Sequence, residues 1–281
     1  MIADIVFKIY RLAFVVPAAI TMHRLRNNLL SGVSADEMIP LVHPIDRQYG
    51  IDTSGVIGYR ELRSGKSADK YNICYGGSQP SIIRKALATL SDHQALTFCD
   101  FGCGKGRALA VASEFSFRRI IGVELAPSLA SIARSNADII RSRFPDRTPI
   151  EVVEGDVLAA PFPEGPVVVY FYHPFYRAMM KKVLNRIENW SRQSEKGGIS
   201  IIYYNPVYFD LFDRSREFSR VFAQNIEFEP NERGTGPNYH DDSDAIAIWQ
   251  NVVKAPIPSI SRSSYATIKV EPPGWRALVV K

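Results

Sequence analysis

The stretch FCDFGCGKGRAL, at residues 98–109, decides the fold of this chain of 281 residues. A short apolar run from Leu96 to Phe101 leads into glycines at positions 102, 104 and 106, and a helical pattern starts at Lys105. Glycine has no Cβ, so such a loop turns tightly and lets a ligand approach the backbone closely. A strand, a glycine loop and a helix in this order predict one unit of an α/β sheet with a ligand at the loop.

The loop departs from the G-x-G-x-x-G pattern of dinucleotide-binding proteins. Counted from Gly102, that pattern requires a glycine at position 107, where this chain has Arg107. Asp100 stands just ahead of the first glycine, and its carboxylate would repel a pyrophosphate but attract a positively charged amino group. We therefore expect Asp100, Gly102, Gly104 and Gly106 to hold a ligand other than a dinucleotide.

Further apolar runs of strand length alternate with helical patterns along residues 81–250. The sequence predicts strands at 96–101, 119–124, 150–153, 167–172, 198–204, 225–228 and 244–250. It predicts helices at 81–91, capped by Ser81, and at 105–115, 127–144, 177–190 and 208–222. The last two strands follow each other without a helix, which favours a hairpin with one antiparallel strand. This series predicts an α/β fold with a doubly wound, mostly parallel seven-stranded sheet and helices on both faces.

Two more carboxylates follow at predicted strand ends. Glu124 ends the second strand, where it can accept hydrogen bonds from both ribose hydroxyls of an adenosine; the alternative is a solvent-facing residue before a helix. Asp156 follows the third strand, where it can accept from an adenine amino group with Val157 against the ring; the alternative is an Asx turn. Because the strand ends meet at one edge of the sheet, Asp100, Glu124 and Asp156 together predict a nucleoside cofactor site.

The segments FCDFGCGKGRAL, IIGVELAP (120–127) and VVEGDVL (152–158) resemble the core of the class I S-adenosylmethionine-dependent methyltransferases. The resemblance implies a Rossmann-like methyltransferase fold with S-adenosyl-L-methionine as cofactor. It places the methionine end at Asp100 and the three glycines, the ribose at Glu124 and the adenine at Asp156. The implied activity is methyl transfer to a nitrogen or oxygen of a protein or small-molecule acceptor. A dinucleotide oxidoreductase of the NAD type and a non-catalytic cofactor-binding module are the alternatives.

The fourth strand ends in Tyr172, His173, Pro174 and Phe175. Amino-group methyltransferases often carry Asn/Asp-Pro-Pro-aromatic at this position, and this chain differs at the first and third residues, which argues against adenine N6 or glutamine as the target. We expect Tyr172 and Phe175 to line the acceptor site. His173 is a candidate general base or, alternatively, a hydrogen-bonding partner of a neighbouring loop. Tyr75, ahead of the first helix, is a candidate gate over the methionine end.

The chain divides by pattern into an N-terminal helix and lid or linker extension (1–70), a methyltransferase domain (71–252) and a C-terminal extension (253–281). Residues 31–70 are polar and rich in Gly and Pro, which favours a linker or a lid. Residues 1–30 predict a helical segment that packs on the core or on a second copy, or that lies on a membrane surface. The longest stretch there without charge, Leu12 to Met22, has 11 residues, whereas a transmembrane helix needs about 20.

The composition excludes some classes and leaves the acceptor open. The net charge of +5 and the absence of interleaved basic and aromatic residues give no indication of nucleic acid. Three cysteines without a paired motif predict reduced, buried thiols in the cytoplasm, and no metal site is expected.

Overall fold

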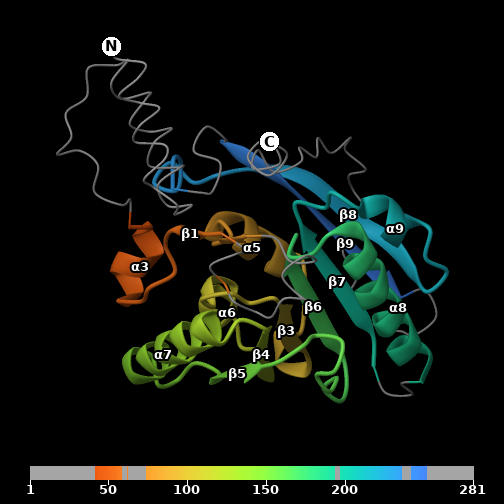
Figure 1. The fold of residues 1–281 in the computed structure, drawn as a ribbon, viewed down its shortest axis with the longest axis horizontal. Coiled ribbons are helices and arrows are strands. Elements are labelled where there is room, and N and C mark those ends of the chain that lie inside the picture. Colours follow the sequence, from red (N-terminus) through yellow and green to blue (C-terminus); the bar gives the residue numbers. More distant parts are fainter. Residues whose placement is uncertain (1–41, 59–61, 63–73, 194–196, 236–241, 252–281) are drawn as a thin grey trace, which may run out of the picture.

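The computed structural model describes residues 42–58, 62, 74–193, 197–235 and 242–251. Its centre is a seven-stranded sheet in the order β5-β4-β3-β6-β7-β9-β8, and only β9 runs antiparallel to its neighbours (Figure 1). This doubly wound, mostly parallel sheet confirms the predicted fold. The strands are β3 (Thr97–Phe101), β4 (Arg119–Glu124), β5 (Ile150–Glu154), β6 (Val167–Tyr172), β7 (Ile199–Tyr204), β8 (Phe218–Glu227) and β9 (Ser243–Asn251).

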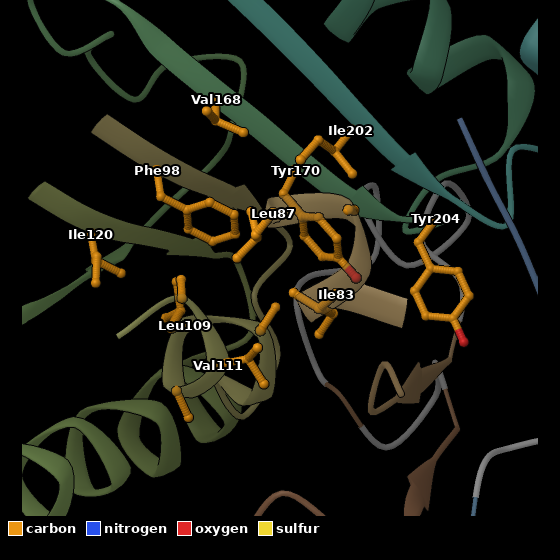
Figure 2. Packing of buried hydrophobic residues seen from close by; sticks show 14 of the residues in the cluster. Ile83, Leu87, Phe98, Leu109, Val111, Ile120, Val168, Tyr170, Ile202 and Tyr204 are labelled. Atoms are coloured by element: carbon orange, nitrogen blue, oxygen red, sulfur yellow. The ribbon is translucent and has the colours of Figure 1, made fainter. Parts of the chain in front are cut away.

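Helices cover both faces of the sheet, because the central strands are apolar on both sides. One face carries α5 (Pro80–Leu87), α6 (Arg107–Ala112) and α7 (Pro127–Arg143), while the other carries α8 (Arg177–Gln193) and α9 (Phe209–Asp213). Figure 2 shows the core on the first face, where Phe98, Leu109 and Ile120 pack together. The second face is filled by residues such as Phe171 and Trp249.

Short elements precede the sheet along the chain. Helix α3 (Pro44–Tyr49) packs on α7, and β1 (Val56–Ile57) pairs antiparallel with β2 (Tyr75–Gly76). A 3-10 turn (His93–Ala95) leads into β3. The helical segment expected at 1–30 and the C-terminal extension lie outside the described residues. In the described part of the chain, no helix is long and apolar enough to cross a membrane.

Three local predictions are wrong. The helix expected over 208–222 ends at Asp213, and β8 begins at Phe218, because pairing with β9 outweighs the apolar spacing. The residue before α5 is Gln79 rather than Ser81, since Pro80 starts the helix and the Ser81 side chain bonds Glu232 instead. Of the cysteines expected to be buried, Cys74 is only partly buried.

Candidate functional site

A cavity that opens to solvent lies at the carboxyl ends of β3, β4 and β6. Strand order reverses here, since β4 lies on one side of β3 and β6 on the other, and ligands of doubly wound sheets bind at such a point. Most residues singled out from the sequence line this cavity: Tyr75, Asp100, Gly102, Gly104, Glu124, Asp156, Val157, Tyr172 and Phe175. Gly106 and His173 are not among the residues that line it.

The glycine loop depends on glycine at each of its three positions. Gly102, Gly104 and Gly106 have φ values of 84°, 55° and 85°, in the left-handed region that side chains disfavour. A Cβ on Gly102 would lie 3.0 Å from the Cβ of Pro174, and one on Gly104 would overlap the ring of Tyr75. The loop is therefore shaped by close approach of other segments as well as by its turn.

Asp100 is a buried carboxyl group that has no counter-ion within the described part of the chain. Its side chain is 3% exposed, and no hydrogen bond joins it to another of the described residues. Burial raises its pKa well above the usual value, and the charge of Glu124 raises it further. A cationic group bound in the cavity would supply the missing partner.

The Glu124 carboxylate binds the backbone of the glycine loop and of the residue before α7. Its Oε2 accepts from the Gly104 N–H and its Oε1 from the Ala126 N–H, each at 2.8 Å. Burial raises its pKa, and these backbone donors partly offset that effect. At 8% exposure it is not the solvent-facing residue of the alternative interpretation. Each oxygen keeps a second lone pair, so the carboxylate can also accept from ligand hydroxyls.

Asp156 begins the loop that forms another wall. It is exposed, and its Oδ1 accepts from the Leu158 N–H at 2.8 Å, which is the Asx turn of the alternative interpretation. The turn does not exclude ligand contact, because Asp156 and Val157 both line the cavity. Arg186, from α8, donates to the carbonyls of Val157 and Ala160 and so fixes this loop from behind.

Arg186 also lies over an aromatic pair. Its guanidinium carbon is 4.4 Å from the centre of the Phe162 ring, which stacks on Trp190 at 4.6 Å.

We expect Arg186→Met to leave the protein folded and to weaken adenosine binding about tenfold, since two carbonyl contacts that shape the wall are lost. Titration calorimetry measures the change. Arg192→Met, an exposed position on the same helix, is the control, and equal affinities in both variants would contradict the assignment.

Of the three candidate catalytic residues at the end of β6, two line the cavity and one does not. Tyr172 lines the cavity and stacks on Tyr204 at 4.2 Å between ring centres, and Phe175 is a buried part of the cavity wall. His173 has a φ of 38°, and its Nδ1 lies 2.6 Å from the Tyr203 hydroxyl. Its ring is therefore directed to β7, as the hydrogen-bonding alternative expects, although the partner belongs to a strand rather than to a loop.

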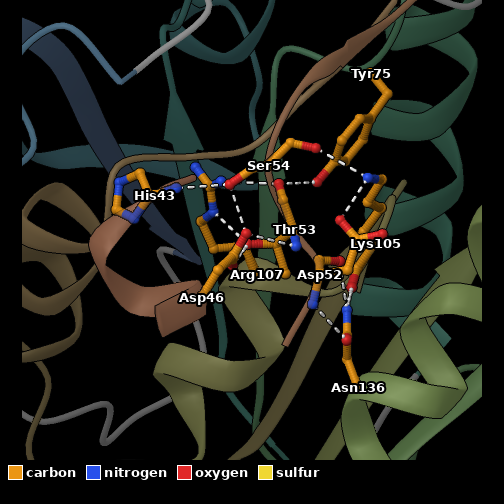
Figure 3. A network of polar contacts seen from close by, with 9 residues as sticks. All are labelled: His43, Asp46, Asp52, Thr53, Ser54, Tyr75, Lys105, Arg107 and Asn136. Atoms are coloured by element: carbon orange, nitrogen blue, oxygen red, sulfur yellow. Dashed lines mark hydrogen bonds and ion pairs between the residues drawn. The ribbon is translucent and has the colours of Figure 1, made fainter. Parts of the chain in front are cut away.

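Several residues that complete the site carry no signal in the sequence. Thr53 bonds Arg107, and the Tyr170 hydroxyl donates to the Ser78 Oγ at 2.8 Å beside the cavity (Figure 3 shows the first pair). The one sequence feature of Arg107 is that it stands where a dinucleotide-binding loop has glycine. These partners come from distant positions of the chain, so no local spacing marks them.

Comparisons with known proteins agree with this geometry. A sequence family described as "Methyltransferase domain" matches residues 99–202, which run from β3 into β7. No curated protein matches the chain.

Solved structures with a similar arrangement include an RNA methyltransferase from Salinibacter ruber in complex with S-adenosyl-L-homocysteine. It is 19% identical, with 64% of this chain and 96% of that chain covered and a TM-score of 0.41. TrmN from Thermus thermophilus is 14% identical over 62% of this chain and 49% of that one, with a TM-score of 0.44. An O-methyltransferase from Bacillus cereus in complex with SAH is 15% identical over 62% and 80%, with a TM-score of 0.42.

Proposed function

We propose a function on the premise that this chain belongs to the class I S-adenosylmethionine-dependent methyltransferases and uses S-adenosylmethionine as its cofactor. The residues present fit that cofactor. The buried carboxyl group of Asp100, which no described residue pairs with, suits its ammonium group, and Glu124 has lone pairs left for ribose hydroxyls. A Cβ at Gly104 would overlap the Tyr75 ring, and one at Gly102 would crowd Pro174, so the loop presents its backbone at both positions.

In this proposal, the cofactor lies along the ends of three neighbouring strands. Asp100 and the loop of Gly102, Gly104 and Gly106 hold its methionine end, with Tyr75 closing that end. Glu124 binds the ribose, and Asp156 and Val157 bind the adenine. Support comes from the order β5-β4-β3, which brings the three carboxylates to one edge in the sequence that the cofactor requires.

The acceptor that we propose is a nitrogen, or secondarily an oxygen, of a protein or small molecule. The observation that carries this choice is the absence of a spare base. Among the described residues that line the cavity, the only carboxylates are Asp100, Glu124 and Asp156, which the cofactor engages. A neutral amine needs positioning and a way for its proton to leave, whereas a hydroxyl needs a base.

The cofactor supplies a methyl group already activated on a sulfonium. With that cofactor bound, an acceptor amine would take the methyl group as the C–S bond breaks, and the extra proton on nitrogen would pass to solvent. The protein aligns the acceptor and excludes water. We propose that Tyr172 and Phe175 form the apolar wall against the acceptor. His173, which lies outside the cavity lining, would then orient Tyr203 rather than serve as the base.

Nucleic acid is the less favoured acceptor. Among the described residues that line the cavity, Arg107 is the only basic side chain, and it is bound to Thr53 rather than directed to a phosphate.

A cytoplasmic location is proposed from the sparse cysteines. The proposed division into an extension, a methyltransferase domain and a C-terminal extension rests on the sequence pattern.

Two measurements test the proposal. Calorimetry is expected to detect binding of S-adenosylhomocysteine and none of NAD(H); the reverse result would overturn it. Incubation with methyl-labelled S-adenosylmethionine and a cell extract then identifies the acceptor class. The label is expected to resist ribonuclease and deoxyribonuclease, and loss of label on either treatment would replace the protein or small-molecule acceptor with a nucleic acid.

A further inference from the structure

A polar network joins the docking segment, residues 43–54, to the glycine loop (Figure 3). The Lys105 Nζ donates to the carboxylate of Asp52 at 2.8 Å and to the carbonyl of Ser54 at 2.9 Å. Asn136 exchanges two hydrogen bonds with the backbone of Asp52, at 2.8 and 2.9 Å. A stretch expected to be a linker or lid is thus fixed to the cofactor loop by specific contacts.

Arg107 is the buried centre of this network, with 3% of its surface exposed. Its Nε donates to the Thr53 Oγ1 at 2.7 Å, and its Nη2 donates to the Thr53 carbonyl at 2.8 Å. The Thr53 hydroxyl donates in turn to Asp46, whose carboxylate also accepts from the Thr53 N–H at 2.9 Å. Thr53 is therefore held through its side chain, its N–H and its carbonyl.

Tyr75 uses the same carbonyl. Its hydroxyl donates to the Thr53 carbonyl at 2.7 Å, and its ring lies against Gly104 so closely that a Cβ there would overlap it. The contacts run from Arg107 to Thr53, from Thr53 to Tyr75, and from Tyr75 back to the glycine loop. Because Arg107 starts the helix that follows this loop, these contacts form a closed ring.

We propose that Arg107 is a positioning residue, which fixes Thr53 and thereby holds the Tyr75 ring over the glycine loop. This inference rests on the proposed function, in which that loop binds the methionine end of the cofactor. None of the hydrogen bonds of Arg107 reaches Glu124 or Asp156. Its influence therefore falls on the amino-acid part of the cofactor and spares the nucleoside part.

The test compares two ligands in a double-mutant cycle of Arg107→Met and Tyr75→Phe. Each variant removes one contact to the Thr53 carbonyl, and each is expected to bind S-adenosylhomocysteine about tenfold more weakly than the unmodified protein. The double variant is expected to bind about as weakly as either single variant, with no further tenfold loss, because both residues act through one contact chain. Adenosine affinity is expected to stay within about twofold.

Tyr49→Phe is the matched control. Tyr49 is buried in the same segment and donates to Glu114 at 2.7 Å, but it does not line the cavity. This variant is expected to lower thermal stability without changing S-adenosylhomocysteine binding. Equal losses for adenosine and S-adenosylhomocysteine, or additive losses in the cycle, would overturn the inference.

The inference stays testable if Arg107→Met does not fold, since Tyr75→Phe keeps the ring and removes only the hydroxyl. Unchanged S-adenosylhomocysteine binding by Tyr75→Phe would then refute it. Failure of the unmodified protein to bind S-adenosylhomocysteine would instead refute the proposed function, so the two failures are distinguishable.

Discussion

Asp100→Asn is expected to weaken S-adenosylhomocysteine binding by more than about a hundredfold, the largest effect of any substitution considered. The variant keeps the shape of the side chain but removes the charge opposite the ligand's ammonium group. Removing one partner of a buried ion pair costs about 3–5 kcal/mol, which corresponds to this loss of affinity. Calorimetry measures the dissociation constant. Asp138→Asn, an exposed position on α7, serves as the control and should bind as the unmodified protein does.

The same carboxyl group predicts a pH dependence. Burial raises the pKa of Asp100 in the cofactor-free protein, whereas an aspartate in the unfolded chain has a pKa of about 3.9. Between these two pKa values the folded protein binds the extra proton, so the contribution of Asp100 to stability falls as the pH rises through that window. A bound ammonium group favours the ionised form, so ligand binding releases a proton there and affinity rises with pH.

Calorimetry in buffers of different ionisation enthalpy detects this released proton. The signal attributable to Asp100 should disappear in Asp100→Asn. An identical proton release from both proteins would assign the titration to another group, such as Glu124, whose pKa is also raised by burial.

Glu124→Ala is expected to produce the second large effect, again a loss of about a hundredfold or more in S-adenosylhomocysteine affinity. The ribose loses a charged acceptor, and hydrogen bonds to charged groups contribute about 1.5–3 kcal/mol each. The variant should also melt at a lower temperature without ligand, because the N–H groups of Gly104 and Ala126 lose their acceptor. Scanning calorimetry and binding calorimetry measure the two effects separately.

A pair of ligands separates the ribose contact from the damage to the loop. The unmodified protein should bind adenosine more tightly than 2′,3′-dideoxyadenosine, while Glu124→Ala should bind both equally weakly. Glu154→Ala is the matched control, since Glu154 lies beside Glu124 at the end of the neighbouring strand but is exposed and pairs with Arg134 instead. A preference for adenosine that persists in Glu124→Ala would remove this residue from the ribose site.

The sheet could be predicted from the sequence because its strands are apolar and well delimited. The bounds of β4 and β6 agree with the expected residues, since a charged residue or a proline flanks each apolar run. The stretch after Tyr208 misled the prediction, because Phe218, Val221 and Phe222 recur at spacings of three and four that suit a helix. Only pairing with β9, which follows later in the chain, decides that Phe218 lies in a strand.

The candidate site likewise has residues that the sequence predicts and residues that it does not. The three carboxylates could be predicted because the ends of parallel strands meet at one edge, whatever the intervening sequence. The roles of Thr53 and Arg186 could not be predicted. Thr53 contacts Arg107, which is 54 residues away in the sequence, and Arg186 contacts carbonyls that are 26 and 29 residues away. Their roles depend on tertiary packing, which local periodicity does not encode.

The place of β9 in the sheet has a consequence for synthesis on the ribosome. This strand is the last described element of the chain, yet it pairs with β7 on one side and β8 on the other. Until residues 243–251 emerge, β7 is an unpaired apolar edge and β8 has no neighbour. Such edges recruit other chains. A nascent or truncated chain that stops before Ser243 should therefore depend on chaperones, although every residue of the proposed cofactor site has already been made.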